Sequence, residues 1–394
     1  MERTIFSFLH ILLLATMFLW GNMLSKSFSS RAFWQKALIP ILVYGVVVGL
    51  RFGRMVDWNL YYFRFLEIGK NYENSNYEIL FKIFNYIFYS IGLPYWSFIF
   101  CESLLLMFAL LFLFKNFKKE LFFILPLCLD LIHNNELYIR WYFAVSFFVV
   151  AISFLISSKP KKAYFFFLIS CLFHYGMVPL LPILFFAKYL NKYAIPPKIA
   201  CILFLITSLG MNVTQLSFFT EISNYILGLG LITNDSAEFY LSRTDDLLNG
   251  DLGNIGIRDS MSFINQVRLY IAYIPIILFS EKSCAKRKYG KLIYNIFVVG
   301  VIVSPLFDSI EITDRYSSLF LLFGCLCGGF LFYDKFIKRD FTDNNSLIQL
   351  KMLFYSICFL SYLWPSISIC FMKLHINEVL YIWDANGRNY LPFL

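Results

Sequence analysis

The sequence has few charged residues for its length. Asp, Glu, Lys and Arg make up 15% of the 394 residues, whereas a soluble domain carries about 25%. Apolar and aromatic residues make up 59%, and they recur in long runs; a helix that crosses a bilayer needs about 20 such residues. The scarcity of charge excludes a soluble protein and predicts a single all-α polytopic membrane domain over residues 1-394.

Recognisable metal-ligand patterns are also lacking. The nine cysteines include no CxxC pair and fall mostly inside apolar runs, where they are typical of small core residues. The sequence has only four histidines. Its acidic groups, Asp308, Glu311 and Asp314 or Asp245 and Asp246, do not have the spacing of a divalent-cation site. We therefore expect no metal and no cofactor.

The net charge of +9 does not indicate a nucleic-acid partner, because the basic residues lie in short clusters between apolar runs. Six lysine-rich clusters hold 20 of the 34 basic residues and are expected to be cytoplasmic. The clusters are Lys26, Arg31 and Lys36; Lys115, Lys118 and Lys119; Lys159, Lys161 and Lys162; Lys188, Lys192 and Lys198; Lys282, Lys286, Arg287, Lys288 and Lys291; and Lys335, Lys338 and Arg339. Both termini are then expected on the opposite, outer side.

About 11–12 transmembrane helices are predicted from the apolar runs. The spans are 4–24, 37–50, 94–114, 120–133, 139–157, 163–173 with 176–187, 196–213, 262–280, 292–307, 316–333 and 347–372. The pair 163–187 is either two short crossings or a hairpin of half-helices broken at Gly176. Between the spans, residues 51–93 form an outer loop with an amphipathic interfacial helix. Residues 214–262 form a second, longer outer loop of the kind used as a lid or binding element.

The basic residues of the predicted outer face are mostly arginines rather than lysines. They are Arg51, Arg54, Arg64, Arg140, Arg243, Arg258 and Arg315. A planar guanidinium matches the oxygens of a phosphate in a way that an ammonium does not. An arginine at the end of a span also commonly extends to the lipid headgroups. The pattern therefore indicates either anchoring or recognition of a lipid-linked anion.

Several short motifs lie on this face. Arg140-Trp141-Tyr142-Phe143-Ala144 opens a span about thirty residues before Phe173-His174-Tyr175-Gly176. Upstream lie Arg54-Met55-Val56-Asp57-Trp58-Asn59-Leu60-Tyr61 and Tyr77-Glu78-Ile79-Leu80, and downstream lies Asp314-Arg315-Tyr316. Together these motifs resemble those of the EpsG-like and Wzy-type O-antigen polymerases, and the resemblance covers roughly residues 45 to 330.

This resemblance implies a membrane glycosyltransferase with a GT-C-like fold in the bacterial inner membrane, acting at the periplasmic face. Such an enzyme moves a glycan chain from undecaprenyl pyrophosphate onto another lipid-linked repeat unit. Its partners are the lipid-linked donor and acceptor and membrane lipid, with a polysaccharide chain-length regulator as a further candidate. The product is expected to be O-antigen, although capsule and exopolysaccharide use the same membrane chemistry.

The resemblance also suggests roles for individual residues. Arginines would bind the pyrophosphate leaving group without a metal: Arg140 first, then Arg51, Arg54 and Arg315, with Arg258 or Arg243 brought by the long loop. The candidates for the catalytic base are Asp57, Glu78 and His174. Glu78 is slightly favoured, because an interfacial helix would hold it near the headgroups. Tyr61 and Trp141 are candidates for stacking on sugars, and the alternative for them is an interfacial aromatic belt.

Two other function classes remain open. A flippase or other transporter of lipid-linked oligosaccharide would carry charges along a central cavity and often an internal repeat, and no repeat is evident here. A membrane acyltransferase that modifies the polysaccharide would also use histidine and arginine, but it would take its donor from the cytoplasmic side. The predicted outer position of His174 argues against this second class.

Overall fold

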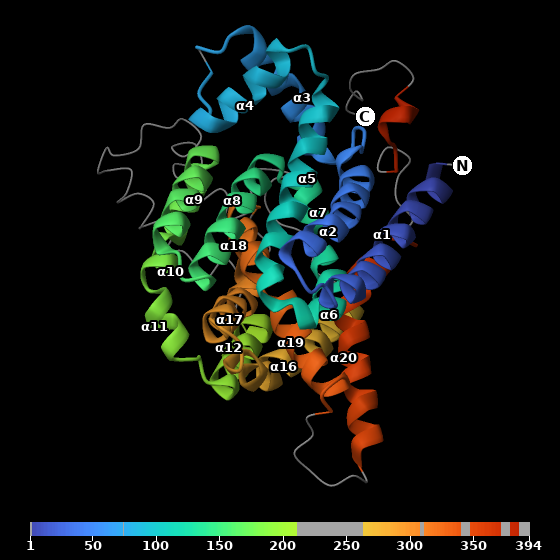
Figure 1. Ribbon diagram of the computed structural model, residues 1–394, viewed down its shortest axis with the longest axis vertical. Coiled ribbons are helices and arrows are strands. Elements are labelled where there is room, and N and C mark those ends of the chain that lie inside the picture. Colours follow the sequence, from blue (N-terminus) through green and yellow to red (C-terminus); the bar gives the residue numbers. More distant parts are fainter. Residues whose placement is uncertain are drawn as a thin grey trace.

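The protein is a bundle of helices (Figure 1). The computed structural model describes residues 2–73, 75–210, 263–307, 311–339, 347–371 and 379–385. Every regular element within these ranges is a helix, apart from one isolated antiparallel bridge between Arg51 and Tyr381. The predicted all-α class is confirmed, whereas the long loop 214–262 lies outside the described residues.

The first half of the chain contains most of the shorter elements. It comprises α1 (Glu2–Ser25), α2 (Ser30–Tyr44), η1 (Gly45–Gly49), α3 (Met55–Lys70), α4 (Ile79–Ser90), α5 (Tyr95–Phe114), η2 (Lys115–Glu120), α6 (Leu121–Leu127), η3 (Cys128–Leu131), α7 (Ile132–Leu137), α8 (Ile139–Ile156) and α9 (Pro160–Phe173).

After His174 the chain continues with η4 (Tyr175–Leu180), α10 (Leu181–Phe185), α11 (Ala187–Lys192), α12 (Pro197–Gly210), α16 (Phe263–Ala285), α17 (Gly290–Phe307), α18 (Glu311–Leu322), α19 (Gly324–Phe336), α20 (Ile348–Ser368) and η9 (Ile382–Asp384).

Six helical stretches are long and apolar enough to cross a membrane, so the chain is a multi-pass membrane protein. They are Glu2–Ser25, Ser30–Gly49, Tyr95–Leu137, Ile139–Ile156, Thr313–Phe336 and Ile348–Ser368. Four shorter apolar helices follow the same pattern: Ile79–Ser90, Tyr175–Phe185, Pro197–Leu209 and Gly290–Leu306. The predicted 11–12 spans therefore correspond to six full-length stretches and several shorter pieces.

The centre of the bundle is built around α8, which packs against α5 and α9. Fifteen of its eighteen residues are buried, as expected for an apolar helix surrounded by other helices. At the periphery α1 packs closely on α6, because Gly21 has no side chain: a Cβ there would lie 2.7 Å from the carbonyl oxygen of Leu121. Such small-residue contacts are typical of membrane helices.

The segment 51–93 contains two helices, α3 and α4, at one end of the molecule (Figure 1). Only one interfacial helix was expected there, and it corresponds to α4. Ile83, Tyr86 and Ile87 of α4 are exposed, whereas Phe81 and Asn85 are buried. The additional helix α3 begins just after Arg54 and packs against α4 and α7. We call this part of the molecule the α3–α4 end.

The lysine clusters are linked to one another at the opposite end. Lys115 donates to Ser30 at 2.6 Å, Asn116 donates to Ser153 at 3.0 Å, and Lys291 donates to the carbonyl of Lys192 at 3.2 Å. The same end holds a buried group of charges, the Arg287 cluster, which consists of Arg287, Glu120, Asp334 and Lys338. The predicted common side of the lysine-rich loops is thus a feature of the fold, and we call it the lysine-rich end.

Candidate functional site

Three helix termini bring Arg140, Glu78 and His174 together at the α3–α4 end. Glu78 immediately precedes α4, Arg140 lies in the first turn of α8, and His174 follows α9. Arg140 Nη1 donates to Glu78 Oε2 at 2.9 Å, and His174 Nδ1 lies 3.7 Å from Glu78 Oε1. We call these three residues the Arg140 cluster. The three residues are at least 34 positions apart in the sequence, so the fold alone makes them neighbours.

The chain after α9 fixes the orientation of His174. The Gly176 N–H donates to His174 Nδ1 at 3.0 Å, so Nδ1 is the acceptor and the proton of the neutral ring lies on Nε2. The Tyr175 N–H donates to Glu78 Oε1 at 3.4 Å. A Cβ on Gly176 would lie 3.0 Å from the His174 ring and 3.1 Å from Trp141. A side chain at this position would therefore press on both rings.

His174 is neutral at pH 7. Its burial, together with the nearby charges of Arg140 and Arg315, holds the pKa of the imidazole well below the ordinary 6.5. Among the residues that the structure describes, no hydrogen-bond partner reaches the buried Nε2 atom. The cluster therefore contains a neutral imidazole that can still donate one hydrogen bond.

Arg140 is held firmly but not saturated. Its side chain is 16% exposed, and the guanidinium lies 5.4 Å from the centre of the Tyr77 ring. Within the described ranges, Nε of Arg140 has no hydrogen-bond partner. A buried guanidinium that keeps spare donors is suited to an anionic group that arrives from outside.

Helix α3 brings Asp57 and Tyr61 beside Arg140. Burial raises the pKa of Tyr61 to about 12, and the charges of Arg140, Asp57 and Arg315 all act on its hydroxyl. The Tyr61 hydroxyl therefore stays protonated. Asp57 is half-buried in the first turn of α3. Two of the predicted site residues thus join the Arg140 cluster from a helix that was not predicted.

Helix α18 closes the opposite side of the site. The Tyr316 hydroxyl donates to the Gly176 carbonyl at 2.7 Å, which anchors the turn that holds His174. The Arg315 guanidinium lies 4.8 Å from the centre of the Tyr138 ring. Tyr138 in turn donates to Asp314 Oδ2 at 3.0 Å. Sequence reasoning missed Tyr138, because its contact with Asp314 spans 176 residues and leaves no local signal.

Trp141 is a packing residue. Its side chain is 2% exposed, and its ring meets His174 and Tyr316 edge to face with centroids 5.2 and 5.1 Å apart. A ring with almost no exposed face cannot stack on a sugar in this conformation. In this structure the Trp141 ring supports His174 and Tyr316, and its contact with a sugar stays a prediction.

Arg51 and Arg54 are buried structural residues. Arg51 is 0% exposed and donates to the carbonyls of Val48 and Glu136. Arg54 is 1% exposed and forms an ion pair of 2.7 Å with Glu136. The Arg54 guanidinium also lies 5.2 Å from the Phe6 ring and 4.7 Å from the Tyr381 ring.

These contacts place Arg51 and Arg54 in the packing between helices, and a role of either residue in binding pyrophosphate stays a prediction. Both side chains are enclosed by protein groups and do not extend to the headgroups. Among the described residues, Nε of Arg51 and Nε and Nη2 of Arg54 have no hydrogen-bond partner. The two side chains tie α1, the C-terminal segment and α7 together. Arg243 and Arg258, the other predicted ligands of pyrophosphate, lie outside the described residues.

The fold and site define a multi-pass helical membrane protein with a buried cluster of arginine, carboxylate and histidine at one end of its bundle. The model of the EpsG family matches residues 36–375, and the chain belongs to that family. It is therefore a membrane protein of the polysaccharide-polymerase kind, related to glycosyltransferases. Neither a curated protein nor a solved structure matches the chain.

Proposed function

We propose that this protein elongates a surface polysaccharide by transferring a glycan chain from undecaprenyl pyrophosphate onto another lipid-linked repeat unit. The observation that carries the proposal is the Arg140 cluster. A guanidinium is held by buried Glu78 yet keeps a donor unused, and it lies beside a neutral histidine and a second arginine. This arrangement suits a phosphate-containing group whose negative charge grows during the reaction.

The proposed reaction breaks the bond between the anomeric carbon of the donor sugar and the pyrophosphate oxygen. An acceptor hydroxyl forms the new bond to that carbon, and its proton passes to a base. The electron pair of the broken bond leaves with the pyrophosphate, where Arg140 and Arg315 stabilise it. The Nε2–H of His174 can donate to the same oxygens, because the imidazole is neutral and Nδ1 is already an acceptor.

We assign the base to Asp57 rather than Glu78. Glu78 is 3% exposed, and both of its oxygens face protein donors, from Arg140 on one side and Tyr175 on the other. A base must come within hydrogen-bond distance of the substrate hydroxyl. Asp57 is half-buried and lies close enough to Tyr61 and Arg140 for its charge to act on both. In this proposal Glu78 positions Arg140 and the 174–176 turn.

The proposed enzyme uses guanidinium groups where other enzymes of pyrophosphate chemistry use a divalent cation. Arginine supplies fixed positive charge and several donors in one plane. It does so inside a site from which water is largely excluded, where such charges have a larger effect than in water. We propose that activity is independent of added metal.

The orientation in the membrane follows from the two ends of the bundle. The linked lysine-rich loops fit the cytoplasmic side of a bacterial inner membrane. The Arg140 cluster at the α3–α4 end would then face the periplasm. The carrier pyrophosphate would lie at the headgroup level, which is also the level of the exposed apolar face of α4.

The test is the length distribution of the surface polysaccharide. Cells that lack this protein are complemented with wild type, Arg140→Ala, Asp57→Asn or Lys119→Ala, and the amount of each in the membrane is measured. We expect single repeat units without the protein and with the first two variants, and normal chains with Lys119→Ala, which changes the lysine-rich end. Unchanged chain lengths in the deletion would overturn the proposal and favour a transporter or an acyltransferase.

A further inference from the structure

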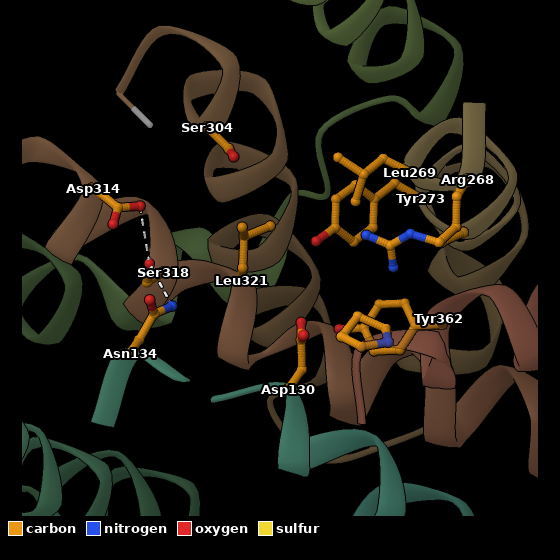
Figure 2. A pocket seen from close by; sticks show the side chains of 12 residues that line it. Asp130, Asn134, Arg268, Leu269, Tyr273, Ser304, Asp314, Ser318, Leu321 and Tyr362 are labelled. Atoms are coloured by element: carbon orange, nitrogen blue, oxygen red, sulfur yellow. Dashed lines mark hydrogen bonds between the residues drawn. The ribbon is translucent and has the colours of Figure 1, made fainter. Parts of the chain in front are cut away.

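A polar cavity of about 160 Å³ lies inside the bundle, beside the N-terminal turns of α18. Figure 2 shows Arg268 and Tyr273 of α16 on one side of the space, with Asp130 of η3 and Tyr362 of α20 opposite. Asn134, Ser318 and Asp314 form a third wall. A smaller cavity of about 50 Å³ adjoins it and shares Asp130, Asn134, Ser318 and Tyr362.

Two charged groups face this cavity without internal partners. Within the described part of the chain, neither the Asp130 carboxylate nor the Arg268 guanidinium makes a hydrogen bond to another residue, and Nε of Arg268 is buried. A buried polar group that lacks a partner costs about 1–3 kcal/mol. The polar groups of a native interior are nearly always satisfied by protein, water or ligand. The cavity is therefore built to receive a group with several hydrogen-bonding atoms.

The chemistry of the lining fits a carbohydrate ring. Tyr273 and Tyr362 meet edge to face with centroids 5.9 Å apart and supply an apolar surface. The carboxylate, guanidinium, amide and hydroxyl groups supply both donors and acceptors. A cavity of about 150 Å³ holds a ring of the size of benzene, and the adjoining cavity of about 50 Å³ adds room for ring substituents. The size and the mixed polarity together match a single pyranose.

The charge balance distinguishes this cavity from the Arg140 cluster. Asp130 and Arg268 carry opposite charges and interact electrostatically across the space, while Asp314 is occupied by Tyr138 and Ser318. A phosphate would therefore meet two carboxylates and one guanidinium. An uncharged sugar would find both hydrogen-bond donors and hydrogen-bond acceptors in the lining. The cavity suits the ring of a neutral sugar and not a pyrophosphate.

One short stretch of α18 connects the cavity to the Arg140 cluster. Asp314 lines the cavity, and the next residue, Arg315, acts electrostatically on His174 and Tyr61. Tyr316 then binds the Gly176 carbonyl. A ring in the cavity and a pyrophosphate beside Arg140 would thus lie on either side of the same turn.

We infer that this cavity binds the terminal, non-reducing pyranose of the acceptor glycan, with Asp130 and Arg268 bonded to its hydroxyls. The inference rests on the proposed function for the identity of the sugar. Asp130 and Arg268 are binding residues that select which ring is presented to the donor. Neither belongs to a motif that the sequence singled out.

The experiment measures binding without turnover. Full-length protein in lipid nanodiscs is titrated with methyl glucopyranoside, galactopyranoside, mannopyranoside and N-acetylglucosaminide, and binding is followed by saturation-transfer NMR. Cyclohexylmethanol is the probe for a ring without hydroxyls, and the matching glycosyl 1-phosphates are the probes for a donor sugar. The variants are Asp130→Asn, Arg268→Lys and the milder Tyr362→Phe, with Lys119→Ala as the control. Melting temperature verifies that each variant is folded.

We expect at least one methyl pyranoside to bind saturably. Asp130→Asn and Arg268→Lys should weaken this binding about tenfold or more, and Lys119→Ala should not change it. The inference is overturned if no pyranoside binds, if cyclohexylmethanol binds as well, or if the variants bind like wild type. Tighter binding of a glycosyl 1-phosphate would assign the cavity to the donor instead. The binding experiment measures no reaction. Normal chain lengths in the deletion strain would therefore refute the proposed function, while the binding of a pyranoside in the cavity would still be decided by the titration.

Discussion

Arg287 at the lysine-rich end and Arg140 at the α3–α4 end use the same chemistry to different degrees. Arg287 donates through all three nitrogen atoms, to Glu120 at 3.0 and 3.2 Å and to Asp334 at 2.6 and 2.7 Å. Arg140 donates through Nη1 to Glu78. The Arg287 side chain is 8% exposed and that of Arg140 is 16% exposed. The Arg287 guanidinium is fully occupied by two carboxylates, whereas that of Arg140 keeps an Nε donor without a partner among the described residues.

The comparison shows that burial of an arginine does not by itself indicate function. Arg51 and Arg54 lie at the same end as Arg140 and are more deeply buried. What distinguishes Arg140 is its neighbourhood of a neutral imidazole, a second guanidinium and a half-buried carboxylate. The structural arginines of this protein hold helices together, whereas the candidate catalytic Arg140 is itself held in place by Glu78.

The largest expected effect concerns a structural pair. Glu136→Gln removes the carboxylate that pairs with Arg54, whose side chain is 2% exposed, and it should lower the free energy of unfolding by roughly 3–5 kcal/mol. Glu120→Gln leaves Arg287 paired with Asp334, and it should cost only about 1.5 kcal/mol. Reversible denaturation in mixed detergent micelles measures both. Equal losses of unfolding free energy in the two variants would show that Asp334 does not compensate for the missing Glu120 carboxylate.

The next effect separates catalysis from folding. Arg140→Lys keeps a positive charge beside Glu78 but removes the planar set of donors, so polymerisation per folded molecule should fall by roughly 10²–10³. Arg287→Lys should lower the melting temperature and leave the rate per folded molecule unchanged. Both rates are measured with purified protein and lipid-linked repeat units. A similar loss of rate in both variants would remove the functional distinction between the two ends.

The sequence predicted the apolar helices well. Residues 94–114 and 139–157 were expected as spans, and the helices run Tyr95–Phe114 and Ile139–Ile156. Long apolar runs leave a buried backbone in a membrane with few alternatives to a helix. The polar segment Met55–Lys70 gave no such signal, because its helix depends on packing against α4 and α7 rather than on an apolar run.

The site was predicted in its residue types and not in its pairings. Arg140, Glu78 and His174 were all selected, and the structure brings them together. Arg54 and Arg140 look alike in the sequence, since each lies at the end of an apolar segment. Only the tertiary structure shows that Arg54 is enclosed by Glu136 and two aromatic rings. Ion pairs between distant segments leave no periodic pattern that a sequence could reveal.

A smaller effect should appear as a dependence of stability on pH. The pKa of folded His174 is held below 6.5, so the unfolded chain takes up a proton first as the pH falls. Stability should therefore decrease below about pH 6.5, by at most about 1.4 kcal/mol per pH unit for this one group. His174→Gln should remove that contribution, whereas His133→Gln, at an exposed position, should not. Melting temperatures between pH 5 and 8 measure the difference, and identical slopes in wild type and His174→Gln would show that folding does not lower the pKa of His174.

The smallest expected effect comes from removing one tyrosine hydroxyl group beside the Arg140 cluster or one elsewhere in the bundle. Beside His174, the Tyr316 hydroxyl donates to the Gly176 carbonyl at a distance of 2.7 Å. Outside the Arg140 cluster, the Tyr294 hydroxyl donates to the Ile277 carbonyl at a distance of 2.8 Å. Replacing either tyrosine by phenylalanine should cost about 1 kcal/mol of stability. Only Tyr316→Phe should also slow polymerisation, by about fivefold, because it releases the turn that orients His174 and Glu78. Equal rates in the two variants would mean that the turn is held by Gly176 and Trp141 alone, and that α18 contributes to the fold without positioning the site.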